Sequence, residues 1–277
     1  MPLPVQPRVV ITGAGGGLGR AFGVVLAARQ GRLILADINL AAAEETSQLV
    51  ERCGGRAVAM RCDVSRIEDV SGLVDAAGSA FGGADLVINN AGVAVGGPLE
   101  DIPVADWEWS VGVNLMGVVN GCRAFLPGFK ALRAGYFLNV ASAVALLAVA
   151  EMAPYFATKA GVIALSESLA AELHGTGIGT TVLCPTFFPS GLGHATRGHG
   201  AMRERLPALM NGMMRRATLT TEDVARRALT AVDRGQLYAL PNAEGRWMWR
   251  IKRMAPELVQ GVLMPRAVAL ARRLFFT

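Results

Sequence analysis

Short apolar runs alternate with longer segments of helical periodicity along most of this 277-residue chain. Strands are predicted where aliphatic residues run almost unbroken, at 8–12, 32–36, 57–62, 85–88, 136–140, 178–184 and 236–240. Helices are predicted between them, at 17–30, up to about 52, and at 67–81, 106–129, 154–174 and 222–232.

This alternation predicts the fold class. Strands that alternate with helices at such spacing form right-handed crossovers and a parallel sheet that helices cover on both faces. The nearly continuous apolar strands agree, since central parallel strands are buried on both sides. We therefore predict an α/β fold: a Rossmann-like, doubly wound parallel sheet of about seven strands in a single domain over 1–241, followed by a helical C-terminal extension over 242–277.

One segment, 186–220, departs from the pattern. It holds glycine, histidine and proline breaks and four methionines between the sixth strand and the helix at 222–232. Apolar positions recur at helical spacing from Met202 onward, which fits a helix packed on the core and fits equally the lining of an apolar ligand site. Arg197, Arg203 and Arg205 are available there as cations. We expect this segment to cover the substrate.

The glycine-rich turn at 12–19 follows a predicted strand and opens a predicted helix. Gly13, Gly17 and Gly19 let the backbone turn tightly and approach a pyrophosphate, and the helix after Leu18 presents free N–H groups to it. This context favours a dinucleotide site over a ligand-free glycine turn. The domain at 1–241 is therefore predicted to bind a dinucleotide.

Asp37 ends the second strand about 20 residues beyond the glycine turn, where an acid can bind both hydroxyls of the adenosine ribose. A carboxylate there repels a 2′-phosphate, and Gly16 and Ile38 supply no cation to offset it. NAD is therefore favoured over NADP. An aspartate that caps the next helix is the alternative.

Six motifs in order over residues 8–190 resemble those of the compact branch of the short-chain dehydrogenase/reductase family. They are the glycine pattern TGxxxGxG at 12–19, Asp63 with Val64 after the third strand, NNAG at 89–92 with Asn90, Ala91 and Gly92, Asn114, Ser142, and the YxxxK pattern of Tyr155 and Lys159. Two positions differ from the family pattern: Thr186 follows Pro185 where a glycine is usual, and Ser190 replaces a threonine that often binds the nicotinamide amide.

The resemblance implies an NAD(H)-dependent oxidoreductase that moves a hydride between the nicotinamide and an alcohol or ketone. Tyr155 is the implied general acid/base and Lys159, four positions along the helix, is on the same face, lowers its pKa and holds the nicotinamide ribose. Ser142 binds the substrate oxygen, and Asn114 holds a relay water. The cofactor-binding residues implied are Gly13, Gly17, Leu18, Gly19, Asp37, Asp63, Val64, Asn90, Ala91, Gly92, Tyr155, Lys159, Pro185 and Ser190.

Two other functions share part of this pattern. The first is an NAD-binding sensor or scaffold protein without turnover, against which the intact Ser, Tyr and Lys set argues. The second is a sugar-nucleotide epimerase or dehydratase, which shares YxxxK but usually carries TGxxGxxG and a larger substrate domain. The apolar character of 186–220 favours an apolar alcohol or ketone as substrate.

Charge is concentrated at the end of the chain. Residues 242–277 carry seven Lys or Arg and two Glu, which accounts for the whole net charge of +5. The basic balance therefore indicates no nucleic-acid partner for the domain. Arg246, Trp247, Trp249 and Arg250 interleave indoles and cations, Val262–Phe276 is apolar, and Pro256 and Pro265 are expected to divide the extension into short helices. Peripheral contact with an anionic bilayer through 245–277 and packing on the body or a partner subunit both remain open.

The remaining features fit a cytoplasmic enzyme. The four cysteines form no metal or disulfide pattern, and Cys62 and Cys184 are expected to be buried thiols. No secretory signal is expected at 1–7, and the apolar run 138–150 is too short to span a bilayer. His174, His194 and His199 are interpreted as incidental, and no metal site is expected. In the resembling family, helices equivalent to 106–129 and 153–174 form a four-helix dimer interface, so a homodimer or homotetramer is expected, with Trp107, Val111, Leu115, Val118 and Val119 as apolar positions on the first helix.

Overall fold

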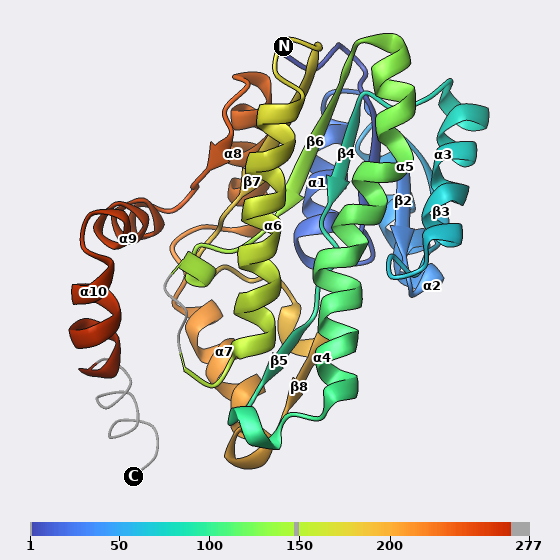
Figure 1. Cartoon of the computed structure of the whole chain (residues 1–277). Coiled ribbons are helices and arrows are strands. Elements are labelled where there is room, and N and C mark those ends of the chain that lie inside the picture. Colours follow the sequence, from blue (N-terminus) through green and yellow to red (C-terminus); the bar gives the residue numbers. More distant parts are fainter. Residues whose placement is uncertain (1, 147–149, 267–277) are drawn as a thin grey trace.

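The computed structural model describes residues 2–146 and 150–266 of the chain. A seven-stranded parallel sheet forms its centre, in the order β3-β2-β1-β4-β6-β7-β9 (Figure 1). The strands are β1 Arg8–Thr12, β2 Arg32–Asp37, β3 Arg56–Arg61, β4 Leu86–Asn89, β6 Gly135–Val140, β7 Ile178–Leu183 and β9 Tyr238–Ala239. The predicted Rossmann-like fold is confirmed. The seventh strand is shorter than predicted, at two residues.

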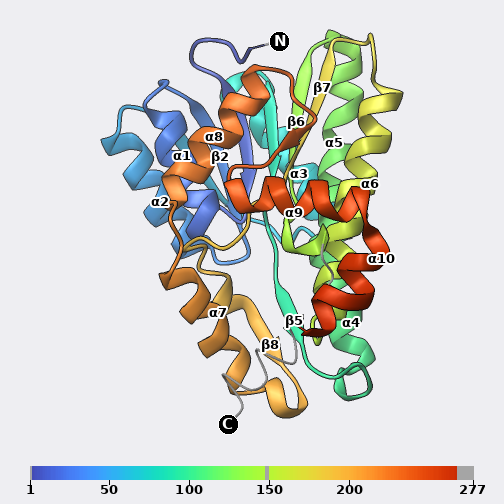
Figure 2. The same ribbon diagram turned by 90° about the vertical axis from the view of Figure 1, so that its left-hand side faces the viewer.

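Helices cover both faces of this sheet, and Figure 2 shows the two layers on either side of it. On one face lie α1 Gly17–Ala27, α2 Leu40–Arg52 and α8 Thr221–Asp233. On the other lie α3 Ile67–Phe81, α4 Val104–Val111, α5 Gly117–Leu132 and α6 Ala153–Glu172. Each face has its own apolar core, one around Phe22 and Leu229, the other around Phe137 and Val162. The buried aliphatic strands between these cores are what fix the layer order.

The single helix predicted at 106–129 is longer and contains a π-helical stretch. Helices α4 and α5 run on through residues 112–116, so that helical backbone extends from Val104 to Leu132. A π-helical turn inserts one residue into the helix and often marks a functional position. Asn114, a predicted site residue, lies in the middle of it.

A second, two-stranded sheet was not predicted. Strand β5 Ala94–Gly96 pairs in parallel with β8 Thr196–Gly198. Strand β8 belongs to the segment 186–220, which also contains α7 Arg205–Arg215 and short 3₁₀ turns at 192–195 and 200–202. Three-residue strands that pair across a hundred positions leave no periodic signal in the sequence.

The C-terminal extension is helical through the residues described. Helix α9 spans Ala243–Met254, α10 spans Pro256–Leu258, and a π-helical stretch follows at Val259–Leu263. The prediction that Pro265 divides the extension is wrong, because helical backbone continues through it to Arg266. The predicted apolar end with Arg272 and Arg273 lies outside the described residues.

Candidate functional site

The glycine turn lies between β1 and α1, next to the end of β4. Gly13 and Gly17 have φ of +64° and +49°, the left-handed region that favours glycine. A Cβ added at Gly19 would lie 2.0 Å from the Gly13 carbonyl oxygen, so the helix could not begin this close to the strand with any side chain there. Leu18 is buried and anchors the helix start in the core. The turn therefore has the tight backbone that a pyrophosphate site requires.

Hydrogen bonds fasten the end of β4 to this turn. The Asn90 side-chain amide donates to the carbonyl oxygens of Thr12 at 2.9 Å and Gly13 at 3.1 Å. The backbone N–H groups of Asn90 and Ala91 donate to the Thr12 hydroxyl. Residues 90–92 and the glycine turn thus form one rigid unit.

Asp37 and Asp63 follow β2 and β3 at the same edge of the sheet. Asp37 ends β2; it accepts a 2.8 Å hydrogen bond from Gly15 N–H through one oxygen and one from Asn39 N–H through the other. Asp63 accepts hydrogen bonds from the N–H and hydroxyl of Ser65, and Val64 beside it is buried. Asp37 thus bonds the glycine turn directly.

Ser142, Tyr155 and Lys159 meet near the ends of β6 and β7. Lys159 is buried, and its Nζ donates a 2.8 Å hydrogen bond to the Val140 carbonyl oxygen. Burial lowers the pKa of Lys159 to about 8. Burial also raises the pKa of Tyr155, while a hydrogen bond with the Ser142 side chain acts to lower it. Serine and tyrosine therefore interact with each other, and the buried Lys159 lies one helical turn along α6 from the tyrosine.

Asn114 is fully buried and turned toward the backbone of Val93. Its Oδ1 accepts from Val93 N–H at 2.8 Å, and its Nδ2 donates to the Val93 carbonyl at 2.9 Å and to the Thr158 hydroxyl at 3.2 Å. The π-helical stretch makes this possible because it brings the side chain to the β4 side. A Cβ at Gly92 would lie 3.2 Å from Asn114 Oδ1 and 3.3 Å from Lys159 Nζ, so the asparagine and lysine converge on one glycine.

Pro185 and Ser190, after β7, lie between the two parts of the site. The Pro185 carbonyl accepts a 2.8 Å hydrogen bond from Ala143 N–H, next to Ser142. The Ser190 carbonyl lies directly over the glycine turn, where a Cβ on Gly17 would be 1.8 Å from it. The chain after β7 thus links the serine to the glycine turn.

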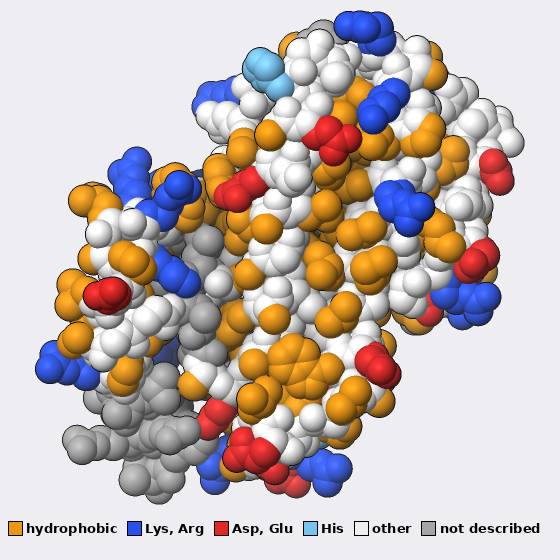
Figure 3. All heavy atoms as spheres, in the orientation of Figure 1, with side chains coloured by type: hydrophobic (Ala, Val, Ile, Leu, Met, Phe, Trp, Pro, Cys, Tyr) orange, Lys and Arg blue, Asp and Glu red, His pale blue; other side chains and the backbone are white. Residues whose placement is uncertain are grey.

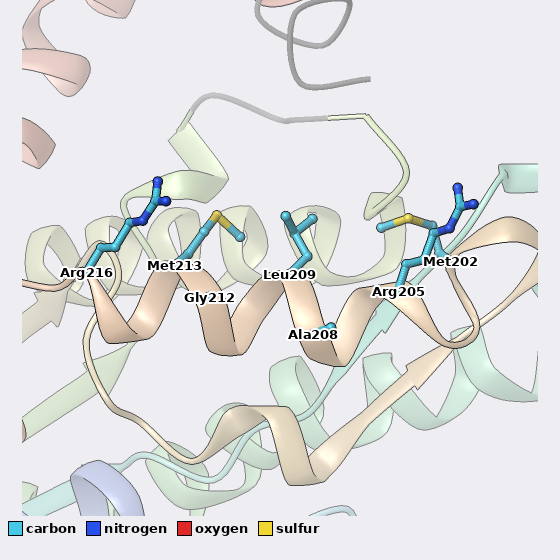
Figure 4. A pocket seen from close by; sticks show the side chains of 7 residues that line it. All are labelled: Met202, Arg205, Ala208, Leu209, Gly212, Met213 and Arg216. Atoms are coloured by element: carbon cyan, nitrogen blue, oxygen red, sulfur yellow. The ribbon is translucent and has the colours of Figure 1, made fainter. Parts of the chain in front are cut away.

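In the methionine-rich segment, some side chains of α7 and the turn before it pack in the core and others line a cavity. Met202, Leu206, Met210 and Met214 are buried and pack as a core cluster. Leu209 and Met213 line a cavity of about 310 Å³ together with Met202, Arg205, Ala208, Gly212 and Arg216 (Figure 4). Tyr155 packs against the core cluster, and Met202 belongs to both the cluster and the cavity wall.

A buried acid holds the segment in place, and the sequence did not reveal it. Asp106 on α4 bonds Arg197 at 2.5 Å and His199 at 2.6 Å, and the Arg197 guanidinium lies 3.7 Å from the centre of the Trp109 ring. Burial works against ionisation of Asp106, but the bonds to Arg197 and His199 outweigh it and lower its pKa. Arg197 is therefore committed to this cluster, and His199 has a structural role in it. The partners are more than 90 positions apart, so spacing carried no signal.

The remaining predictions concern the cysteines, a metal site and a membrane-spanning helix. Cys62 and Cys184 are buried free thiols, as predicted. Within 2–146 and 150–266, no group of three or more His, Cys, Asp or Glu is placed to hold a metal ion. No helix in the same ranges has the length and apolar character needed to cross a membrane.

The sequence of this chain is similar to those of several known oxidoreductases. The family model described as short chain dehydrogenase matches residues 7–199. Among curated proteins, the chain is 34% identical over 188 residues to D-threitol dehydrogenase of Mycolicibacterium smegmatis, covering 67% of this chain and 71% of that one. It is 36% identical over 180 residues to 3beta-hydroxysteroid dehydrogenase 1 of Eggerthella lenta, covering 64% and 69%. It spans only 30% of the length of the probable oxidoreductase EphD of Mycobacterium bovis, at 34% identity over 180 residues.

A solved structure is similar to this chain over most of its length. A short chain dehydrogenase/reductase from Burkholderia phymatum, crystallised in complex with NAD, superposes with a TM-score of 0.86 at 33% identity. The alignment covers 91% of this chain and 95% of that chain. The likeness therefore extends beyond residue 199.

Proposed function

Because this chain belongs to the short-chain dehydrogenase family of oxidoreductases, we propose that it transfers a hydride between NAD(H) and an apolar alcohol or ketone, with Tyr155 as general acid/base. The proposal is supported by the interaction of Ser142 with Tyr155 and by the buried Lys159, whose ammonium group bonds the Val140 carbonyl two residues before Ser142. When bound, the nicotinamide supplies or accepts the hydride. The side chains of the protein supply or accept the proton.

Tyr155 holds that proton. In the reducing direction its hydroxyl donates to the oxygen that becomes the alcohol, and in the oxidising direction the phenolate takes the proton back. Ser142 donates to the same substrate oxygen and fixes it beside Tyr155. The positive charge of Lys159 stabilises the phenolate, and the attraction between the two charges is stronger in a buried site than in water. Burial alone acts against the phenolate, so the lysine and the serine are both needed.

The glycine turn, Asp37 and residues 90–92 are the groups we assign to the cofactor. Gly13, Gly17 and Gly19 allow the close backbone packing around the start of α1, where the helix N-terminus would bind phosphates. Asp37 suits two ribose hydroxyls and repels a 2′-phosphate, which favours NAD. Asp63 and Val64 would lie at the adenine, and Pro185 and Ser190 at the nicotinamide. Asn114 is assigned to the proton relay through its position between Gly92 and Thr158.

The cavity on α7 supports an apolar substrate. Its wall is formed by methionine, leucine, alanine and glycine, with Arg205 and Arg216 at the two ends of the helix (Figure 4). Flexible methionine side chains adapt to irregular apolar shapes. The two relatives described above act on a polyol and on a steroid by their names, so the preference comes from the cavity and not from them.

The outer face of α4, α5 and α6 supports an assembly of at least two copies. Trp107, Val111, Leu115 and Val119 recur every four positions and are partly exposed, whereas Val118 is buried in the core. Figure 3 shows hydrophobic side chains spread over this face, with few charges among them. A second copy of the chain that packs on it would remove these side chains from water.

A second exposed apolar stripe supports contact between the extension and an anionic membrane surface. Trp247, Ile251, Met254, Leu258 and Val262 follow one another at helical spacing, and all are exposed, Met254 at 86%. Cations lie among the indoles: Arg250 lies over the Trp247 ring and Arg253 over the Trp249 ring. Figure 3 shows the resulting mixture of apolar and basic side chains over α9 and α10. Such a surface suits the boundary between anionic headgroups and acyl chains.

A screen of alcohols and ketones with NAD(H), followed at the nicotinamide absorbance, tests the proposed function. Turnover of at least one apolar substrate, faster with NAD(H) than with NADP(H), is the expected result. An NAD-binding sensor or scaffold protein would instead bind NADH and turn over nothing in the whole screen. A polyol as the best substrate would contradict the substrate class but not the reaction.

A further inference from the structure

The start of helix α9 is bonded to Thr186, the position where the family pattern has a glycine. The Thr186 N–H donates to Asn242 Oδ1 at 3.2 Å, and its hydroxyl donates to Glu244 Oε1 at 2.9 Å. Thr186 and Asn242 are both buried. A glycine at 186 could make the first of these bonds but not the second, so this departure from the pattern gives α9 an added attachment.

Asn242 is used in an unusual way for its position. It is the N-cap residue of α9, where an asparagine side chain normally accepts a hydrogen bond from its own helix. Here that side chain makes no capping bond and accepts from Thr186 instead. The helix gives up a cap in order to be held against the chain after β7.

Gly245 brings α9 into close contact with the loop that carries Ser142. It is the buried residue of α9, and a Cβ there would lie 3.1 Å from Thr186 Cγ2 and 3.3 Å from the Ala143 Cβ. Ala143 directly follows Ser142, and α9 also contacts residues 144–146. Figure 2 shows α9 crossing the molecule from beside α8 toward α6. The serine loop (residues 141–146) is thus packed between β7 and α9.

We propose that Thr186, Asn242, Glu244 and Gly245 form a clasp that seats α9 on the serine loop and so holds Ser142 in position for the reaction. The residues of the clasp are positioning residues, since none touches the reacting atoms. The inference rests on the proposed function and extends it: the C-terminal extension becomes part of the active site. Trp249 against Tyr238 and Arg246 on the Leu240 carbonyl add to the attachment of α9, but only the clasp reaches the serine loop through the buried Gly245.

Two glycine variants of the same extension test the clasp. Gly245→Val places a branched side chain against Ala143 and Thr186, and Gly261→Val places the same side chain where nothing lies within 4 Å. Both substitutions put a β-branched residue into helical backbone, so their intrinsic cost to the helix is similar. Only the first should lift α9 from the serine loop.

Two kinds of readout are needed. Hydrogen exchange of the backbone N–H groups of 142–146 should speed up in Gly245→Val and not in Gly261→Val. The kcat should fall by at least about tenfold in Gly245→Val, because small misplacements of an orienting group are costly, while the Kd for NADH stays within about twofold. The Ser142 hydrogen bond lowers the pKa of Tyr155, so the acidic limb of alcohol oxidation should also move to higher pH.

Wild-type exchange at 142–146, or a wild-type kcat and pH limb, in a folded Gly245→Val variant would overturn the clasp. If that variant does not fold, Thr186→Val and Thr186→Ser replace it: serine keeps the hydroxyl and should restore the activity that valine loses, and equal activities would overturn the proposal. If the wild type oxidises no alcohol but exchange rises only in Gly245→Val, the proposed function fails and the seating of α9 stands.

Discussion

The Lys159 ammonium group donates a 2.8 Å hydrogen bond to the Val140 carbonyl oxygen at the end of β6. The side chain is 4% exposed, and among the described residues no carboxylate forms a salt bridge with it. A buried cation with a single neutral acceptor is costly. The cost is consistent with a lysine kept for chemistry rather than for stability.

Replacing this lysine should therefore stabilise the cofactor-free protein. Burial lowers the pKa of Lys159 in the folded protein to about 8, from an ordinary value of 10.5. At pH 7 the lysine is still charged, and burying that charge reduces the free energy of unfolding. Lys159→Met should raise the free energy of unfolding at pH 7 by about 1–3 kcal/mol while abolishing turnover. Because the pKa of Lys159 is lower in the folded protein, the loss of stability that the buried charge causes is complete below pH 8 and fades toward pH 10.5. The stability gained by Lys159→Met should fade over the same range. Denaturant unfolding at pH 7 and pH 10 measures it; a variant less stable than wild type at pH 7 would contradict the account.

Cofactor preference should depend on Asp37. The carboxylate accepts from Gly15 N–H and faces the glycine turn, so it repels a 2′-phosphate. Asp37→Ala combined with Ile38→Arg should weaken or reverse the preference for NAD, which the ratio of kcat/KM for the two cofactors measures. The matched control is Ile38→Arg alone, which keeps the carboxylate and should keep most of the preference. A wild type with a higher kcat/KM for NADP would show that Asp37 does not act in this way.

Assembly can be tested by light scattering at micromolar concentration. We expect at least the mass of a dimer for the wild type. Val111→Glu, on the partly exposed stripe of α4, should shift the mass toward the monomer because it places a charge in the proposed interface. Val104→Glu, at a position already 72% exposed, is the control and should leave the mass unchanged. A monomeric wild type would refute the proposed interface.

Membrane contact can be tested by flotation of the whole protein with anionic liposomes. Binding is expected at low salt. It should weaken at high salt, because salt screens the attraction between the cations near Trp247 and the anionic headgroups. Trp247→Ser with Ile251→Ser should abolish it, whereas Val5→Ser with Val104→Ser, at two more exposed apolar positions elsewhere, should not. Protein that stays unbound at low salt, or binding that survives the first pair of substitutions, would leave the extension without this role.

Periodicity was enough to predict the sheet and its helices, because buried parallel strands such as β2 and β4 are nearly continuous aliphatic runs. Motif spacing was enough to bring Ser142, Tyr155, Lys159 and Asn114 together, because strand ends of a parallel sheet meet at one edge. What spacing could not supply was contact between segments far apart in the chain.

Two groups of three residues illustrate that limit. Asp106 meets Arg197 and His199 across two separate elements, and either partner alone reads as an ordinary surface charge. Thr186 meets Asn242 and Glu244 after a crossover of more than fifty residues. The substitution at 186 was visible in the sequence as a departure, but its compensating partner was not.

Tyr155→Phe, assayed with NAD(H) and a substrate found in the screen, tests the central claim most directly. The substitution removes one oxygen and the transferable proton, and it leaves the packing against Phe156 and the α7 cluster in place. We expect kcat to fall by at least about 100-fold while NADH binds within a few-fold of wild type. Turnover comparable to wild type, with NADH still bound, would contradict the assignment of Tyr155 as the general acid/base.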